Sequence, residues 1–280
     1  MGTYYLSGAY NFNMDADRTA NRLKYDCLLF DMDDTLYPMS SGLNLACRKN
    51  IQEFMLHHLN IEESEVPRMC LDLYREYGTT MAGLKVLGYE FDDDEFHAFA
   101  HGRLPYDKLK PDPVLRNLLL SMPQRKIIFT NADKEHAAEV LKRLGLEGCF
   151  EGVICFETLN PPVNAANFTD DALVNDKSCC SKTRIICKPA LDAFEAAIQI
   201  ANVDPRRTIF FDDSTRNIAT GKAAGLHTVI VGSSSLVAGA DHALSSIHNI
   251  KEAIPEIWDG EGEQQEQVIQ PAAVETPVLA

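Results

Sequence analysis

Five short runs of apolar residues are spaced along the chain, and longer segments that mix polar and apolar residues separate them. Each run is continuously apolar and rich in branched or aromatic side chains, instead of alternating apolar with polar positions. Strands that are covered on both faces of a parallel sheet have this pattern. The predicted strands are Cys27–Phe30, Ile127–Thr130, Val153–Cys155, Thr208–Phe211 and Thr228–Val231.

Helical segments lie between the later runs. Apolar residues recur at helical spacing over 135–144, 189–201 and 217–224, and a glycine follows two of these segments. Pro189 is expected at a first helical position, where proline is favoured. Strands that alternate with helices predict a Rossmann-like, doubly wound α/β fold around a parallel sheet.

The connection between the first two strands, about ninety residues long, far exceeds what a crossover requires. Its pattern predicts helices over roughly 42–58, 67–77, 81–87 and 93–101. A helical insert at this point is expected to form a small cap domain over the carboxyl ends of the strands, where ligands bind in open α/β sheets. We therefore expect an α/β core at 25–37 and 107–258, with a helical cap at 38–106.

Three further segments have little periodicity. Residues 1–24 are polar and mixed in charge and are expected to be a flexible N-terminus, without the apolar stretch of a secretory signal. Residues 160–183, rich in Asn, Asp, Ser and Pro, predict a long irregular loop. The Gln-, Glu- and Pro-containing segment 259–280 is expected to be a disordered tail.

Composition narrows the class of protein. The net charge of −15 argues against binding to polymeric nucleic acid, because a protein that binds a phosphate backbone needs a surplus of Lys and Arg. A small anionic substrate remains compatible with this net charge.

No stretch reaches the length of a membrane-spanning helix, so we expect no membrane contact. We also expect a cytoplasmic or nuclear protein that is monomeric or homodimeric. The eight cysteines are expected to be buried free thiols, rather than disulfides, a zinc site or redox groups.

Acidic residues follow the first predicted strand directly. Asp31 and Asp33 come after Leu28-Leu29-Phe30, in the run Asp31-Met32-Asp33-Asp34-Thr35. One carboxylate of such a pair can attack a substrate while the other transfers a proton to and from the leaving oxygen. The alternative is an acidic turn without chemistry.

Two further candidates are polar groups near strand and helix ends. Thr130 and Asn131 follow the second strand and could bind phosphate oxygens, or cap the next helix. Lys188, immediately before Pro189, could neutralise a transferring phosphoryl group, or lie on the surface in solvent.

A second acidic pair follows a buried strand. Asp212 and Asp213 end the run Phe210-Phe211-Asp212-Asp213-Ser214, where two acids are costly unless a metal or cations bind them. Carboxylate oxygens that leave room for water and phosphate suit Mg²⁺. The competing reading is a helix N-cap formed by Asp213 or Ser214.

In this order the motifs resemble the haloacid dehalogenase-like (HAD) hydrolase superfamily, over roughly residues 26–232. The resemblance implies that Asp31 is the nucleophile and first magnesium ligand. It also implies that Asp33 is the general acid and base, with its backbone carbonyl on the metal, and that Lys188 clamps the charge of the phosphoryl group.

The same resemblance assigns the remaining site residues. Thr130 and Asn131 correspond to phosphate ligands. Asp213 corresponds to the acidic metal ligand, and Asp212 to a supporting acid beside it. Dehalogenases of the superfamily lack an acid at the position of Asp33, whereas its phosphatases and phosphomutases need one, so the presence of Asp33 implies phosphoryl transfer.

Longer stretches resemble the plant type of the pyrimidine 5′-nucleotidase-like branch. They are 30–38, the segment from Tyr77-Gly78 to Gly83-Leu84, and His101-Gly102-Arg103-Leu104-Pro105-Tyr106 leading into 109–112. This implies Mg²⁺-dependent hydrolysis of a nucleoside 5′-monophosphate. The alternatives are a phosphatase for another small metabolite (a sugar phosphate, pyridoxal phosphate or a flavin-type phosphate), a phosphomutase, or a non-catalytic binding protein.

Three cap residues have two readings each. Thr79 and Thr80 could hydrogen-bond a base or sugar, or cap the next helix. Arg103 could contact phosphate or ribose, or be a surface residue at the hinge of the cap, which is the reading we favour.

Overall fold

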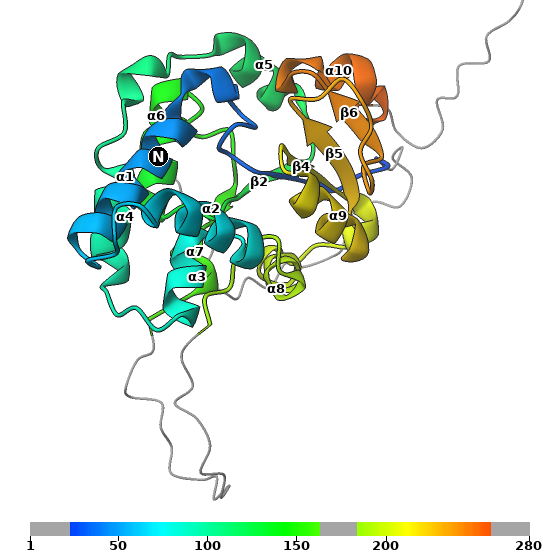
Figure 1. The fold of residues 1–280 in the computed structure, drawn as a ribbon. Coiled ribbons are helices and arrows are strands. Elements are labelled where there is room, and N and C mark those ends of the chain that lie inside the picture. Colours follow the sequence, from blue (N-terminus) through cyan, green and yellow to red (C-terminus); the bar gives the residue numbers. More distant parts are fainter. Residues whose placement is uncertain (1–22, 163–183, 259–280) are drawn as a thin grey trace, which may run out of the picture.

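The computed structural model describes residues 23–162 and 184–258 (Figure 1). The segments expected to be a flexible N-terminus and a disordered tail, and nearly all of the predicted loop at 160–183, lie outside these ranges. None of the helices within them has the length and hydrophobicity to cross a membrane.

A parallel sheet of six strands, in the order β3-β2-β1-β4-β5-β6, forms the centre of the described chain. The strands are β1 (Cys27–Phe30), β2 (Arg125–Phe129), β3 (Gly152–Ile154), β4 (Thr208–Asp212), β5 (His227–Val231) and β6 (His242–Leu244). The first five match the predicted runs to within two residues at each end. The sequence pattern missed β6, which has only three residues and begins with a half-exposed histidine.

Apolar residues on alternate positions of β1 face opposite sides of the sheet. Leu28 and Phe30 join one hydrophobic cluster, which includes residues of α5 (Pro113–Ser121), α6 (Lys134–Leu144) and α10 (Ile250–Ala253). Cys27 and Leu29 join another, with α8 (Leu191–Ala201) and α9 (Thr215–Ala223). Helices on both faces of a parallel sheet make the doubly wound α/β fold that the sequence predicts.

The long connection after β1 is helical. It contains α1 (Leu43–His57), α2 (Val66–Tyr77), α3 (Thr80–Val86) and α4 (Asp93–His101), close to the predicted bounds. These helices bury a third hydrophobic cluster, and within it the Phe54 ring has edge contacts with Phe91, Phe96 and Phe99. They form the blue-to-cyan group beside the sheet in Figure 1. The division into core and cap stays our interpretation of this arrangement.

Two helices begin elsewhere than predicted. Helix α8 starts at Leu191, so Pro189 precedes it, and Lys188 and Pro189 lie in a turn in which Ala190 N–H donates to Cys187 O. The side chain of Asn131 binds the backbone of Lys188 on both its N–H and C=O, which explains why this segment stays outside the helix. Helix α9 starts at Thr215, two residues before the prediction, because Ser214 is its N-cap.

Candidate active site

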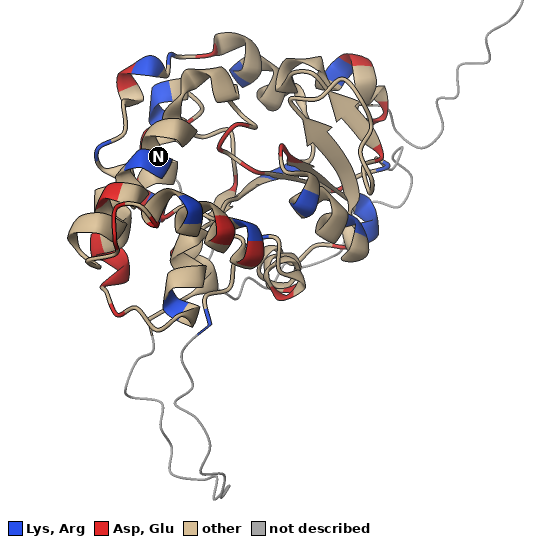
Figure 2. Cartoon of the chain, viewed as in Figure 1, with Lys and Arg blue, Asp and Glu red and all other residues tan. Residues whose placement is uncertain are grey.

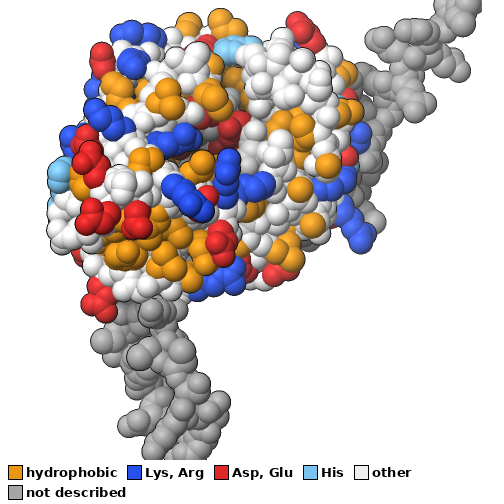
Figure 3. All heavy atoms as spheres, in the orientation of Figure 1, with side chains coloured by type: hydrophobic (Ala, Val, Ile, Leu, Met, Phe, Trp, Pro, Cys, Tyr) orange, Lys and Arg blue, Asp and Glu red, His pale blue; other side chains and the backbone are white. Residues whose placement is uncertain are grey.

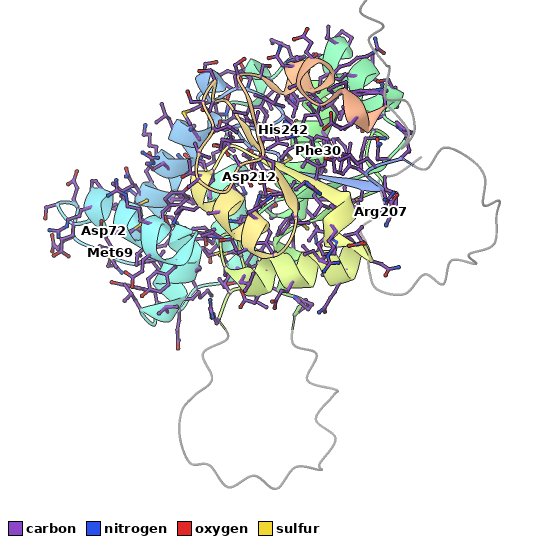
Figure 4. The ribbon with its side chains drawn as sticks, turned by 90° about the vertical axis from the view of Figure 1, so that its right-hand side faces the viewer. Phe30, Met69, Asp72, Arg207, Asp212 and His242 are labelled. Carbon is purple, nitrogen blue, oxygen red and sulfur yellow. The ribbon has the colours of Figure 1, made fainter. Side chains whose placement is uncertain are left out.

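Asp31 and Asp212 lie side by side at the carboxyl ends of neighbouring strands. In the register of β1 and β4, Phe30 pairs with Phe211, and Asp31 N–H donates to Phe211 O at 2.8 Å. Both carboxylates are buried. Figure 4 shows Asp212 at the end of β4 that faces α2, the helix that carries Met69 and Asp72, whereas Arg207 lies at the opposite end.

Lys188 joins the two carboxylates. Its Nζ atom lies 2.7 Å from Asp31 Oδ1, 2.8 Å from Asp212 Oδ2 and 2.8 Å from Phe129 O, so three acceptors take its three protons. Burial alone would lower the pKa of Lys188, but the two carboxylates outweigh burial and raise it, so the side chain stays charged. A lysine in solvent, the alternative reading of the sequence, is therefore wrong.

Carboxylate oxygens of Asp31, Asp212 and Asp213 lie within 4.8 Å of one another. Burial and the neighbouring acids raise the pKa of Asp31, although Lys188 opposes this, and burial together with Asp212 raises the pKa of Asp213 to about 7. Three acids that face one ammonium group need further positive charge to ionise together. Oxygen ligands of this kind fit Mg²⁺. Figure 2 shows acidic segments at the centre of the molecule, where the strands end.

The residues after β4 divide the structural and chemical roles between them. Ser214 caps α9 by accepting from Asn217 N–H, which leaves Asp213 free to face the acidic cluster. Asp212 is fixed by the Ser214 N–H and by the Asn217 side chain, in addition to Lys188. The N-cap reading is thus confirmed for Ser214.

Asp33 lies apart from this acidic cluster. Its Oδ1 atom accepts from Tyr37 OH at 2.5 Å and lies 2.8 Å from His136 Nε2. Burial would raise the pKa of Asp33, but His136 and Tyr37 outweigh it and hold the pKa at about 2. The side chain is 36% exposed and lines a cavity, so it is open to a substrate. Sequence reasoning gave Tyr37 and His136 no role, although Tyr37 lies four positions from Asp33 in one short stretch; His136 lies 103 positions from Asp33.

The two predicted phosphate ligands, Thr130 and Asn131, differ in which of their hydrogen-bonding groups are free to bind a phosphate. Thr130 Oγ1 accepts from Ala132 N–H at 3.1 Å, and the N-cap of α6 is Asp133, so neither Thr130 nor Asn131 caps that helix. The amide of Asn131 binds the Lys188 backbone through one N–H and through its oxygen, and the role of Asn131 as a phosphate ligand stays a prediction. Its backbone N–H has no acceptor among the described residues and stays available.

Backbone N–H groups also line the turn after β1. Asp34 has a φ of 59°, in the left-handed region, and within the described chain no acceptor serves the N–H groups of Met32 and Asp33. Successive N–H groups in a turn of this kind form a concave site for an anion. A phosphate group here would lie beside Asp31.

A cavity of about 380 Å³ lies between the sheet and the cap helices. Asp33, Asn131 and Asp213 line it from the core. Thr79 and Thr80 line it from the cap, where Thr79 caps α3, as one of its two readings predicted, and Thr80 donates to Cys70 O.

The remaining sequence candidates lie away from the chemistry. Arg103 pairs with Glu53 at 2.9 Å and packs over Phe99 on the cap surface, as expected of a surface residue. Six cysteines in the described ranges are free thiols, namely Cys27, Cys47, Cys70, Cys149, Cys155 and Cys187, and all but Cys47 are fully buried. Cys179 and Cys180 lie outside those ranges.

Known proteins resemble this chain in sequence and fold. A family model described as haloacid dehalogenase-like hydrolase matches residues 25–225. Phosphate metabolism protein 8 of Saccharomyces cerevisiae is 29% identical over 211 residues, which are 72% of this chain, and the match spans 60% of the yeast protein. Two solved structures share the fold at 16% identity. CbbY from Rhodobacter sphaeroides, in complex with phosphate, has a TM-score of 0.51, and a HAD phosphatase from Thermococcus onnurineus has 0.50; each match covers 81% of this chain and 96% of the other.

Proposed function

The chain belongs to the haloacid dehalogenase-like hydrolases, and from this premise we propose that it is a magnesium-dependent phosphomonoester hydrolase with Asp31 as its nucleophile. One observation carries the proposal. A second carboxylate, that of Asp33, faces the cavity beside the cluster of Asp31 and Lys188, instead of binding within that cluster. An acid in this place can protonate a leaving alkoxide, which phosphate-ester hydrolysis requires.

The metal would be held by Asp31, Asp213 and the backbone carbonyl of Asp33, with Asp212 supporting them. When bound, Mg²⁺ offsets the negative charge of the phosphoryl oxygens and of the carboxylates. Lys188 adds a fixed positive charge on the same side, because three acceptors hold its ammonium group in place.

The phosphoryl group would be bound by the backbone N–H groups of Met32, Asp33 and Asn131, together with the Thr130 hydroxyl. Lys188 would attract it by charge alone, because its three protons are already bound. Asp31 attacks phosphorus in line, and the electrons of the breaking P–O bond pass to the leaving oxygen. Asp33 donates its proton to that oxygen. The charge of the phosphate favours a protonated Asp33 and so opposes the effect of His136 on its pKa. Asp33 then takes a proton from water, which attacks the aspartyl-phosphate and releases inorganic phosphate.

For the substrate, we propose a nucleoside 5′-monophosphate. The segments shared with the pyrimidine 5′-nucleotidase-like branch support this, and the cavity of about 380 Å³ has aromatic and hydroxyl groups in its wall. Basic side chains gather near the middle of the face shown in Figure 3, which favours an anionic ligand despite the net charge of −15. The yeast relative is named for phosphate metabolism, which fits any phosphomonoester.

Phosphate release tests the proposal. Purified protein is incubated with nucleoside 5′-monophosphates, sugar phosphates, pyridoxal phosphate and a flavin-type phosphate, with Mg²⁺ or with a chelator. We expect release that needs Mg²⁺ and is lost in Asp31→Asn. Failure to hydrolyse any of them with Mg²⁺ would favour a non-catalytic binding protein, and transfer to an added sugar acceptor would favour a phosphomutase.

A further inference from the structure

One oxygen of the Asp33 carboxylate is fully used, and the other is open. Tyr37 OH and His136 Nε2 both bind Oδ1, while Oδ2 has no hydrogen-bond partner among residues 23–162 and 184–258. A carboxyl group whose Oδ1 accepts two donors can carry a proton only on Oδ2. The structure therefore selects which oxygen of Asp33 exchanges a proton with the substrate.

His136 is held rigidly in the first turn of α6. Asp133, the N-cap, accepts from the N–H groups of Glu135 and His136, and the His136 side chain is 2% exposed. Its ring stacks on the ring of His101, with centroids 4.4 Å apart. These contacts leave the imidazole little freedom to turn away from Asp33.

Tyr106 fixes the other side of the same ring. Its hydroxyl lies 2.7 Å from His136 Nδ1 and can donate to it. The neutral ring then carries its proton on Nε2, and a protonated ring carries one there too. In either state Nε2–H donates to Asp33, so the contact does not depend on the charge of the histidine.

The residues around His136 come from the segment that leads from the cap helices back to the sheet. Tyr106 begins a short 3₁₀ helix, Tyr106–Lys108, and His101 is the last residue of α4. His101 Nδ1 lies 2.5 Å from Asp133 Oδ1. This return segment thus touches the start of α6 at two points, and a hydrogen-bonded chain runs from Tyr106 through His136 to Asp33.

We infer that His136 is a positioning residue for the acid–base step, and that Tyr106 holds it in place from the return segment of the cap. The inference rests on the proposed phosphatase function. His136 keeps Asp33 turned toward the cavity and away from Lys188 and the acidic cluster, where a free carboxylate would be drawn by positive charge. Without it, Tyr37 alone holds Oδ1, and Asp33 keeps less of the orientation that delivers a proton to the leaving oxygen.

Leaving groups that differ in their need for a proton test this role. The alkoxide of uridine 5′-monophosphate requires an acid, whereas p-nitrophenolate leaves without one. The value of kcat/KM reports steps up to the departure of this group. We expect His136→Phe, which keeps an aromatic ring but no donor, to lower kcat/KM about 100-fold for uridine 5′-monophosphate and less than about 3-fold for p-nitrophenyl phosphate.

Further variants distinguish the loss of a positioning contact from a general loss of folded structure. His136→Gln keeps an N–H donor and should recover much of the loss, and Tyr106→Phe should show the same substrate selectivity more weakly. Because His248 binds Asp112 away from the cavity, His248→Phe should leave the ratio of the two kcat/KM values unchanged. If His136→Phe fails to give a cooperative thermal transition, Tyr106→Phe and His136→Gln carry the test.

Equal losses on both substrates, or no loss on either, would overturn the role of His136. Asp33→Asn reveals which proposal has failed. One outcome is that Asp33→Asn loses kcat/KM mainly for uridine 5′-monophosphate while the His136 and Tyr106 variants show no such difference between the two esters. In that case only this inference is wrong. If the unaltered protein hydrolyses none of the phosphomonoesters tested, these two included, the proposed function fails, and the inference fails with it.

Discussion

The Nζ atom of Lys188 lies 2.7 Å from Oδ1 of Asp31, although 157 positions separate the two residues in the chain. The same ammonium group binds Asp212, and the backbone of Lys188 is held by the side chain of Asn131. Gly78 of the cap packs so closely on the Lys188 carbonyl that a Cβ at position 78 would clash with it. The ion pair of Lys188 and Asp31 is thus held by residues from the ends of the strands, from the turn at Lys188 and from the cap.

Removal of the Lys188 charge should affect stability as well as activity. Lys188→Met keeps most of the volume but leaves Asp31 and Asp212 buried without their cation. We expect the free energy of unfolding to fall by about 3 kcal/mol, because a broken buried ion pair leaves uncompensated charge. Urea denaturation measures this change, and Mg²⁺ should restore part of the loss.

A matched variant controls for the loss of a lysine. Lys142 on α6 is 66% exposed, so Lys142→Met should change stability by less than about 0.5 kcal/mol. Equal effects of the two substitutions would show that the ion pair at Lys188 contributes little to the fold.

Mg²⁺ should stabilise the folded protein through the acidic cluster. At a concentration of about 100 times the dissociation constant, a ligand that binds only the folded state adds about 2.7 kcal/mol. We expect the melting temperature to rise with Mg²⁺ in the unaltered protein and much less in Asp213→Asn. Asp72→Asn on the cap surface, where the side chain is 54% exposed, serves as the control and should respond like the unaltered protein. A full response from Asp213→Asn would place the metal elsewhere.

Asp133 should make stability depend on pH in the acid range. Burial would raise its pKa, but the hydrogen bond and charge of His101, with the charge of His97, outweigh burial and hold the pKa well below the ordinary value of 3.8. A depressed pKa in the folded state stabilises the protein above pH 3.8, and this stabilisation is lost as the pH falls further. Asp133→Asn keeps an N-cap oxygen but removes the charge.

The free energy of unfolding, measured by urea denaturation between pH 6 and pH 3, tests this dependence. At pH 6 we expect Asp133→Asn to be less stable than the unaltered protein by about 2 kcal/mol. This difference should shrink below pH 3.8, where the aspartate begins to bind protons in the unfolded state. A difference that stays constant across the range would contradict the assignment.

Much of the fold could be predicted from the sequence, because the information lies in local patterns. Continuous apolar runs mark five buried strands, and the adjacency of Asp31 and Asp212 follows once their strands end at the same edge of the sheet. Strand β6 was not predicted, because its three residues, two of them half-buried, are too few to show a hydrophobic pattern. The start of α8 was misplaced because Asn131, 57 positions away from Lys188, holds the chain in a turn.

The network around Asp33 could not be predicted in the same way. His136 lies 103 positions from Asp33 in the chain, and Tyr106 lies 30 positions from His136. His136 belongs to no motif, Tyr106 lies in a stretch that carries only the family resemblance, and a histidine in the first turn of a helix has many structural explanations. Only the packing of the cap's return segment against α6 brings these side chains together.

Capture of the phosphorylated nucleophile tests the central claim most directly. Asp33→Asn is mixed with p-nitrophenyl phosphate and Mg²⁺, because this ester needs no acid to form the intermediate and the variant lacks the base that hydrolyses it. After an acid quench, borohydride reduces an aspartyl-phosphate to homoserine, and peptide mass spectrometry locates it. We predict homoserine at position 31, which depends on substrate and Mg²⁺. Homoserine at another aspartate, or full Mg²⁺-dependent activity in Asp31→Asn, would contradict the account.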